Sequence, residues 1–202
     1  MVTVHHLQKS RSKRVIWLLE ELKMPYKLVT HERDPVTNLS PNSLKAIHPL
    51  AKAPIIIDGK NTICESGAIM EYILDQCQED TLRPSKSSEN YYKYLEWLHF
   101  AEGSLSLPLI TKLIMNKESR DGTKPLDSYI EKEINLDFSY VEQTLSKQAY
   151  FSGDAFTAAD IMMTFMLEIA FSLGLLTGKE STQRYLATMQ KRPAYLKTAN
   201  YG

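Results

Sequence analysis

Cysteine is scarce in this sequence. Only two of the 202 residues are cysteines, Cys64 and Cys77, and they do not form a CxxC pair. Two isolated cysteines give little support to a disulfide framework, a zinc site or a dithiol redox motif. Because reduced, sparse thiols are typical of the cytosol, we expect a cytoplasmic protein.

The chain also lacks an excess of charge and any long apolar run. Its 24 Lys and Arg residues balance 24 Asp and Glu residues. Nucleic acids and anionic membranes select a basic surface, so we expect neither as a partner. No run approaches the roughly 18 apolar residues of a membrane-spanning helix. The N-terminus shows no basic region followed by the apolar core of a secretory signal.

The first part of the chain alternates between strand and helix patterns. Residues 2–7 are rich in β-branched side chains and predict a strand, as do residues 26–31. Between them, apolar residues recur at helical spacing from Val15 to Leu22. A strand, a helix and a second strand form a βαβ unit, which implies parallel strands.

A second pair of strands is predicted after a proline-containing loop. Residues 34–49 read as a loop with one short helical piece, and residues 55–57 as a strand. Asp58-Gly59 is a hairpin turn signal, so residues 61–64 should return antiparallel. A helix begins at Glu65. We therefore expect a small mixed sheet with helices packed on it.

The composition changes after a polar linker at residues 82–88. No convincing strand pattern follows it, and the remaining chain predicts an all-helical part. The sequence therefore predicts two domains, at residues 1–80 and 88–202. The helical segments expected in the second are 89–115, with a bend before Pro108, then 126–146, 157–173, 181–190 and 194–200.

Two conspicuous motifs favour structural roles. Thr157 and Asp160 form a capping box at the start of an apolar helix, with the two side chains bonding reciprocally to the helix N-terminus. His5 and His6 are adjacent in a strand, where successive side chains point to opposite faces. Both cannot easily bind one ion, so we expect no metal site.

Glu65-Ser66 offers a binding site for a zwitterion. At a helix N-terminus, unsatisfied N–H groups and the helix dipole favour an anion, so Ser66 can hold a carboxylate. The carboxylate of Glu65 can bind an ammonium group. Together they suit the head of an amino acid. The alternative is that one of them merely caps the helix, and the pair taken alone favours that alternative.

The segment before the second strand pair has a second binding feature. Pro54 is compatible with the start of a strand in either isomer. In the cis form it would turn the N–H and C=O of Ala53 outward at the sheet edge. An extended peptide can pair with such an edge as an added strand.

Ser10 lies between the first strand and the first helix. No His/Asp partnership indicates a serine hydrolase. Its hydroxyl can instead donate a hydrogen bond to a bound thiolate, which would lower a thiol pKa by roughly one to two units. Ser10 alone is more often a helix cap, and Ser12 is open to either role.

The sequence resembles the cytosolic glutathione transferases over essentially its whole length, in a serine-type form typical of a bacterial or fungal branch. Four segments carry the resemblance in the family's order. The resemblance implies a thioredoxin-like domain at residues 1–80, an all-helical domain at 88–202, and a homodimer. The segments are SRSKRVIWLLEEL (10–22), HPLAKAPIII (48–57), ESGAIMEYI (65–73) and FTAADIMM (156–163).

The resemblance assigns glutathione, γ-Glu-Cys-Gly, to the candidate residues. In this family a Glu-Ser pair holds the γ-glutamyl head, a role that would fall to Glu65 and Ser66. Ala53, before a cis Pro54, would pair with the cysteinyl backbone. Lys52 would reach the carboxylate of the tripeptide.

The resemblance also selects a residue to activate the thiol. In serine-type branches the activating serine lies four residues before the arginine of the first helix, which selects Ser10 over Ser12. Activation by Ser12 or by backbone N–H groups stays open. No tyrosine or cysteine lies at residues 7–14, unlike in the tyrosine-type and cysteine-type classes.

The expected activity is conjugation of the glutathione thiolate to small, electrophilic, largely apolar compounds, without a metal. One alternative is a non-catalytic glutathione-binding protein with a regulatory or scaffold role. Another is a glutathione-dependent peroxidase or isomerase that uses the same site. Fold-level resemblance does not separate these activities, because function depends on the site.

Overall fold

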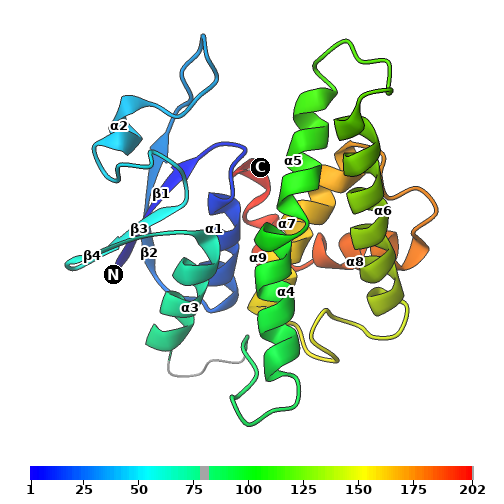
Figure 1. Cartoon of the computed structure of the whole chain (residues 1–202). Helices are drawn as coiled ribbons and strands as arrows, with labels where there is room; N and C mark the ends of the chain where they lie inside the picture. The colour runs from blue at the N-terminus through cyan, green and yellow to red at the C-terminus, as the bar shows by residue number, and fades with distance from the viewer. Residues whose placement is uncertain (78–81, 202) are drawn as a thin grey trace. The chain divides into compact units, whose positions relative to one another are not determined.

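The computed structural model describes residues 1–77 and 82–201. The chain forms two compact units. The N-terminal unit comprises Met1–Thr81 together with Gln190–Gly202, and the helical unit comprises Leu82–Met189. Figure 1 follows the chain from end to end by colour.

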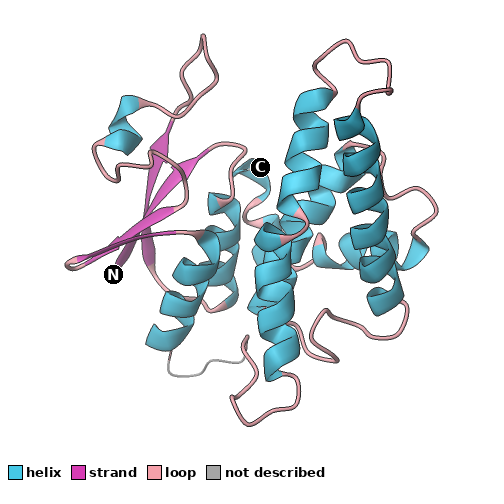
Figure 2. Ribbon diagram, in the orientation of Figure 1, coloured by secondary structure: helices cyan, strands magenta, loops and turns pink. Residues whose placement is uncertain are grey.

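A four-stranded sheet forms the centre of the N-terminal unit (Figure 2). The strands are β1 (Val2–Leu7), β2 (Tyr26–His31), β3 (Ile55–Asp58) and β4 (Asn61–Cys64), in the order β2-β1-β3-β4. β1 pairs parallel with β2, whereas β3 is antiparallel to both of its neighbours. The βαβ unit and the hairpin expected from the sequence are both confirmed.

The helices of this unit are α1 (Ser12–Glu21), α2 (Asn42–Lys45) and α3 (Ser66–Gln76). α1 and α3 pack side by side on one face of the sheet (Figure 1). The first eight residues of α1, from Ser12 to Leu19, are all buried. This burial fixes the position of the loop between β1 and α1, which carries the candidate serine.

The C-terminal tail packs on α1. It contains α9 (Pro193–Leu196) and the 3₁₀ turn Ala199–Tyr201. The Arg192 guanidinium donates two hydrogen bonds, of 2.7 and 2.9 Å, to the Glu21 carboxylate. The sequence placed residues 190–202 in the helical domain. The structure groups them with the N-terminal unit, because the tail packs on α1 of that unit. The ion pair between Arg192 and Glu21 joins positions 171 apart in the chain.

The helical unit contains α4 (Tyr91–Gly103), α5 (Ser106–Met115), α6 (Pro125–Leu145), α7 (Ala158–Ser172) and α8 (Glu180–Met189). The stretch expected as one bent helix, 89–115, is two helices. The break falls between Gly103 and Ser106, and Pro108 lies in the first turn of α5. Proline is tolerated there because an N–H in the first turn has no intrahelical acceptor.

The buried helix α7 starts at the predicted capping box, which the structure confirms. Asp160 accepts hydrogen bonds from the Thr157 N–H and hydroxyl at 2.8 and 2.9 Å. The Phe151 N–H (3.0 Å) and the Tyr185 hydroxyl (2.7 Å) donate to its other oxygen. Burial raises the pKa of Asp160, although these four donors act to lower it. This carboxylate therefore joins three separate segments of the unit.

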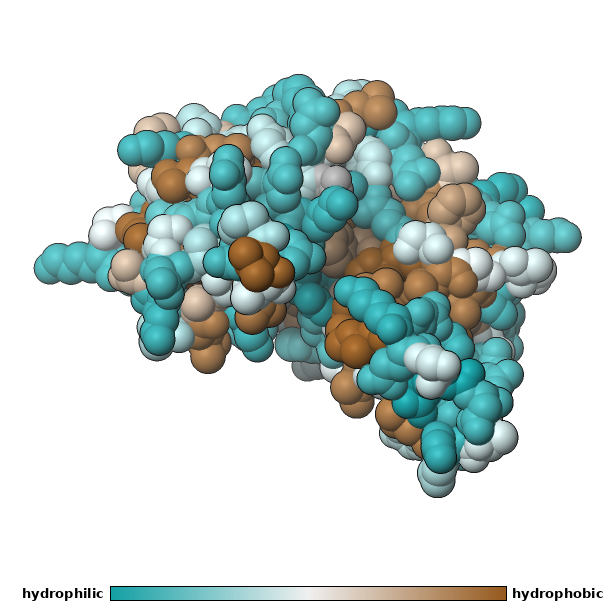
Figure 3. Space-filling model, turned by 90° about the horizontal axis from the view of Figure 1, so that it is seen from above, coloured by the Kyte–Doolittle hydropathy of each residue, from teal (hydrophilic) through white to brown (hydrophobic). Residues whose placement is uncertain are grey.

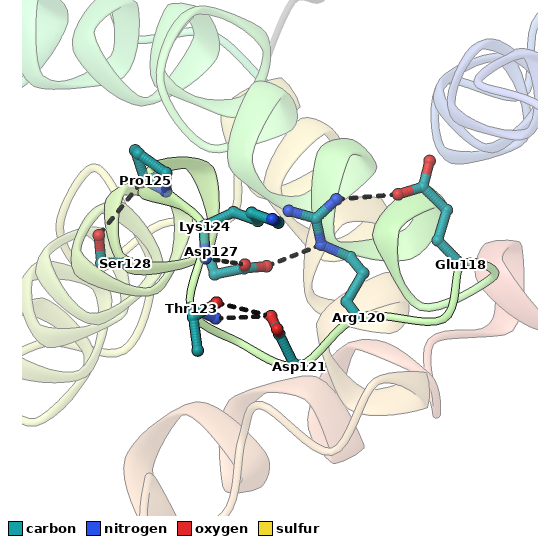
Figure 4. Close-up of polar contacts among 8 residues, drawn as sticks. All are labelled: Glu118, Arg120, Asp121, Thr123, Lys124, Pro125, Asp127 and Ser128. Carbon is teal, nitrogen blue, oxygen red and sulfur yellow. Dashed lines mark hydrogen bonds and ion pairs between the residues drawn. The ribbon is translucent and has the colours of Figure 1, made fainter.

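The loop before α6 is held by a smaller set of polar contacts (Figure 4). Arg120 donates to Asp127 at 2.8 Å and to Glu118 at 2.9 Å. Asp127 also accepts the Lys124 N–H at 2.9 Å, which caps α6. Arg120 thus pairs with both Glu118 and Asp127, and we assign these contacts a structural role.

Candidate functional site

Strand register brings the predicted site residues to one edge of the sheet. His5 of β1 lies opposite Ile55 of β3, and Ile55 lies opposite Cys64 of β4. Because β3 runs antiparallel to both neighbours, its N-terminal end lies beside the C-terminal ends of β1 and β4. Residues that follow β1, precede β3 or follow β4 therefore share this edge.

All six predicted site residues fall in those three positions. Ser10 follows β1, whereas Glu65 and Ser66 follow β4. The three remaining residues, Lys52, Ala53 and Pro54, directly precede β3. The sheet topology therefore brings three loop or helix-start segments to one edge of the sheet, although the first and last of them are more than 40 residues apart in the chain.

The segment before β3 presents backbone groups at this edge. The Ala53–Pro54 peptide bond is cis. Ala53 is half-buried and Lys52 is exposed. The main chain of Ala53 makes no hydrogen bond to any part of the chain that the structure describes. Its N–H and C=O are therefore not used by the sheet.

Glu65 has an unusual backbone conformation. Its φ of 71° with ψ of 120° lies outside the regions that non-glycine residues normally adopt. Such conformations cost on the order of 1–3 kcal/mol and persist where the surroundings impose them. The exposed side chain makes no capping bond to α3 among the described residues, so the capping alternative does not hold for Glu65.

Ser66 is the first residue of α3 and is only 4% exposed. The N–H groups of this first turn have no intrahelical acceptors, and the helix dipole adds positive potential. An anion at this point is stabilised by both. The negative side chain of Glu65 directly precedes this point. Glu65 therefore favours a positive group of a ligand, and Ser66 favours a negative one.

Ser10 and Ser12 differ in exposure. The Ser10 side chain is partly exposed, whereas Ser12 is fully buried. Their hydroxyl oxygens lie 2.7 Å apart, and the Ser12 N–H donates to the Ser10 Oγ at 3.3 Å. Ser10 is therefore the member of the pair that a ligand can touch.

His6 belongs to the same cluster, although the sequence indicated only that it faces the opposite side of the strand from His5. Its Nδ1 lies 2.7 Å from the Ser12 Oγ, and its side chain is fully buried. Burial, with a smaller contribution from His31, lowers the pKa of His6 to about 4. The expectation that His5 and His6 point to opposite faces is confirmed, because His5 instead contacts His31 at 3.0 Å.

Arg33 is a second residue whose role the sequence did not indicate. Its guanidinium donates to the carbonyls of Gln8 (3.1 Å) and Lys9 (3.2 Å) in the β1–α1 loop, and to that of Asn38 (3.1 Å). It thereby ties the loop that carries Ser10 to the segment after β2. An arginine shortly after a strand gives no local signal of this bridge.

No group of three or more His, Cys, Asp or Glu side chains in the described ranges is arranged to hold a metal ion. No helix in those ranges is long and apolar enough to cross a membrane.

Comparison with known proteins decides the family. Residues 1–75 match the glutathione S-transferase N-terminal domain, and residues 104–193 match the C-terminal domain. Glutathione S-transferase 3 of Schizosaccharomyces pombe is 33% identical over 210 residues, which cover 96% of this chain and 85% of that protein. The chain belongs to the glutathione S-transferase family. This confirms the family and enzyme class predicted from the sequence.

Solved structures of glutathione S-transferases share the fold. One from Actinobacillus pleuropneumoniae has a TM-score of 0.89 and 31% identity, with 99% of this chain and 92% of that chain covered. A glutathione transferase of Phanerochaete chrysosporium, solved with oxidized glutathione, has a TM-score of 0.80 and 21% identity, with 98% and 93% covered. The predicted thioredoxin-like domain followed by a helical domain is confirmed.

Proposed function

We propose that this glutathione S-transferase binds glutathione at the edge formed by Ser10, Ala53 and Glu65-Ser66, and that it transfers the thiolate to small electrophilic, largely apolar compounds. The observation that carries the proposal is the backbone conformation and exposure of Glu65. It is strained, exposed and not used as a cap, and it lies beside the open N-terminus of α3.

Each part of the tripeptide has a matching group. The γ-glutamyl ammonium pairs with the Glu65 carboxylate, and its α-carboxylate accepts bonds from Ser66 and the first turn of α3. The cysteinyl backbone pairs with the N–H and C=O of Ala53, before cis Pro54, as an added strand does. Lys52 reaches the C-terminal carboxylate.

Ser10 acts on the thiol in this proposal. Its hydroxyl donates a hydrogen bond to the sulfur, which stabilises the thiolate over the thiol and lowers the thiol pKa. The thiolate attacks the electrophilic carbon and forms a C–S bond, and the electron pair leaves with the leaving group or is protonated on the acceptor. The exposure of Ser10, against the full burial of Ser12, supports this assignment.

The assembly and location belong to the proposal as well. We propose a homodimer in the cytoplasm that needs no metal. Apolar residues are visible among the polar ones on the surface of the helical unit (Figure 3). Leu107, Ile114 and Leu136 are 64%, 54% and 62% exposed there, which supports an interface with a partner.

Turnover of a generic aryl halide by wild type and Ser10→Ala tests the proposal. If the thiol pKa rises by one to two units, the thiolate fraction at pH 6.5 falls about 10- to 100-fold, and turnover falls with it. Ser85→Ala, at an exposed serine of the helical unit, serves as the control. Undiminished turnover in Ser10→Ala would contradict the role of Ser10. Glutathione binding without turnover across a panel of electrophiles would instead favour the regulatory or scaffold alternative.

Activity toward peroxides or isomerisable substrates would identify the third alternative. These reactions use the same thiolate, so they require the same depressed thiol pKa. A substrate panel therefore separates the reaction types, whereas the thiol pKa tests the site that all of them share.

A further inference from the structure

A line of three side chains runs from the interior of the N-terminal unit to the candidate site. His6 lies on β1, Ser12 begins α1, and Ser10 lies in the loop between them. The His6 Nδ1 is 2.7 Å from the Ser12 Oγ, and the Ser12 Oγ is 2.7 Å from the Ser10 Oγ. Only Ser10, at the end of the line, is partly exposed.

Each of the two short gaps must contain one hydrogen atom. Otherwise two lone pairs would face each other at 2.7 Å. The hydrogens available are the hydroxyl hydrogens of Ser10 and Ser12 and the single ring hydrogen of a neutral His6. Burial keeps His6 neutral, since its pKa is about 4. The position of the ring hydrogen therefore decides how the other two are used.

A hydrogen on the Nε2 of His6 would disable Ser10. The bare Nδ1 would then have to accept the Ser12 hydroxyl hydrogen. The gap between the two serines could be filled only by the Ser10 hydroxyl hydrogen. Ser10 would point its hydrogen inward and would have none to donate to a ligand.

A hydrogen on Nδ1 has the opposite effect. It fills the first gap, Ser12 donates to Ser10, and the Ser10 hydroxyl is left to donate outward. Ser12 has one other acceptor, the Leu7 carbonyl, but this contact is 3.4 Å long against 2.7 Å for the contact with Ser10. The Ser12 N–H also donates to the Ser10 Oγ, so Ser10 accepts twice and donates once.

The surroundings of the second ring nitrogen indicate which form is present. The Nε2 of His6 is buried without a hydrogen-bond partner in the described parts of the chain. The Tyr201 ring packs edge-on against the imidazole, with ring centroids 5.0 Å apart. A buried N–H without an acceptor is rarer than a buried acceptor without a donor. The lack of an acceptor for Nε2 therefore favours the form with the hydrogen on Nδ1.

We infer that His6 is a positioning residue, held in its Nδ1–H form, which orients the hydroxyl hydrogens of Ser12 and Ser10 outward toward the ligand sulfur. The inference rests on the proposed function, because that function supplies the ligand sulfur. The positions of the hydrogens themselves do not depend on any ligand. Successive bonds in such a chain also polarise one another, so His6 strengthens the bond that Ser10 donates.

The ring form of His6 can be measured directly in the free protein. Long-range ¹H–¹⁵N correlation spectra of protein labelled with ¹⁵N-histidine distinguish a protonated from a bare ring nitrogen. The signals of His6 are assigned by their loss in His6→Asn. We expect a protonated Nδ1 and a bare Nε2. A protonated Nε2 would overturn the inference.

The thiol pKa of bound glutathione tests the consequence for the site. We expect His6→Phe to raise it by roughly 0.2–0.5 unit, a fraction of the one to two units expected for Ser10→Ala. His6→Asn should retain most of the effect, because its amide can present an N–H where Nδ1 lies. His5→Phe is the matched control. It removes a buried, hydrogen-bonded histidine from the opposite face and should leave the thiol pKa unchanged.

The outcomes separate the inference from the proposed function. A low thiol pKa that rises in Ser10→Ala but not in a folded His6→Phe contradicts the inference alone. A wild-type thiol pKa equal to that of free glutathione contradicts the proposed function and the inference with it. If His6→Phe does not fold, the wild-type spectrum and His6→Asn still decide the question.

Discussion

The two units of this protein each bury a polar network, and the networks differ in how they end. In the helical unit, Asp160 accepts four hydrogen bonds from Phe151, Thr157 and Tyr185. In the N-terminal unit, the line from His6 through Ser12 ends at a partly exposed Ser10. The first network is closed on itself, whereas the second is open toward solvent.

This difference separates stability from function. A closed network stabilises the fold because every donor is satisfied within the protein. An open network leaves its last hydroxyl for a ligand, and strain at Glu65 adds to the cost of the same site. Changes in the helical network should therefore affect unfolding first, and changes at the N-terminal edge should affect glutathione first.

The largest expected effect is on the closed network. Asp160→Ala leaves four buried donors without an acceptor and should lower the free energy of unfolding by about 3–5 kcal/mol. Urea unfolding measures the loss, with Asp154→Ala, at an exposed aspartate nearby, as the control. A loss below about 1 kcal/mol would show that the network is not what stabilises α7.

The next effect concerns pH and the buried end of the open network. His6 has a pKa of about 4 when folded, against an ordinary value of 6.5. The unfolded chain therefore binds a proton between these values that the folded chain does not, and stability falls as the pH drops from about 6.5 to 4. The lowered pKa of His6 should reduce the free energy of unfolding at pH 4 by about 2–3 kcal/mol relative to pH 7.

His6→Phe removes that contribution and should flatten the decline of stability in this pH range. Urea unfolding of wild type and variant at several pH values between 7 and 4 measures the difference. A parallel decline in the two proteins would mean that His6 is accessible to protons in the folded state, contrary to its burial.

The smallest effect is expected from relieving strain at the site. Glu65→Gly permits the positive φ and should raise the free energy of unfolding by up to about 1 kcal/mol, after the entropic cost of glycine. It should also weaken glutathione binding by removing the carboxylate. Lys23→Gly, at another residue with positive φ (52°), should stabilise without loss of binding. Equal glutathione affinity in Glu65→Gly and wild type would show that the strained residue Glu65 does not bind glutathione.

Local patterns made much of the fold predictable. The strands, the hairpin at Asp58-Gly59 and the capping box at Asp160 each depend on residues within a few positions of one another. The attachment of residues 190–202 to the N-terminal unit was not predictable, because the Arg192–Glu21 pair has no local signature. The helix break at 104–105 was likewise misplaced. The sequence predicted a bend before Pro108, but proline is tolerated in the first turn of a helix.

The candidate site divides in the same way. The residue types at Ser10 and Glu65-Ser66 indicated their chemistry, and the sheet register places them at one edge. The roles of His6 and Arg33 depend on contacts across the fold. Strand alternation could show only that His5 and His6 face opposite sides, not that Ser12 would lie against one of them.

The most direct test is a titration of the thiol of bound glutathione by its thiolate ultraviolet absorbance, in wild type and in Ser10→Ala. The account predicts a pKa about one to two units below that of free glutathione in wild type, and a return toward the free value in Ser10→Ala. An unshifted pKa in both proteins would contradict thiol activation at this site, and absence of binding would show that Glu65-Ser66 does not recognise the tripeptide.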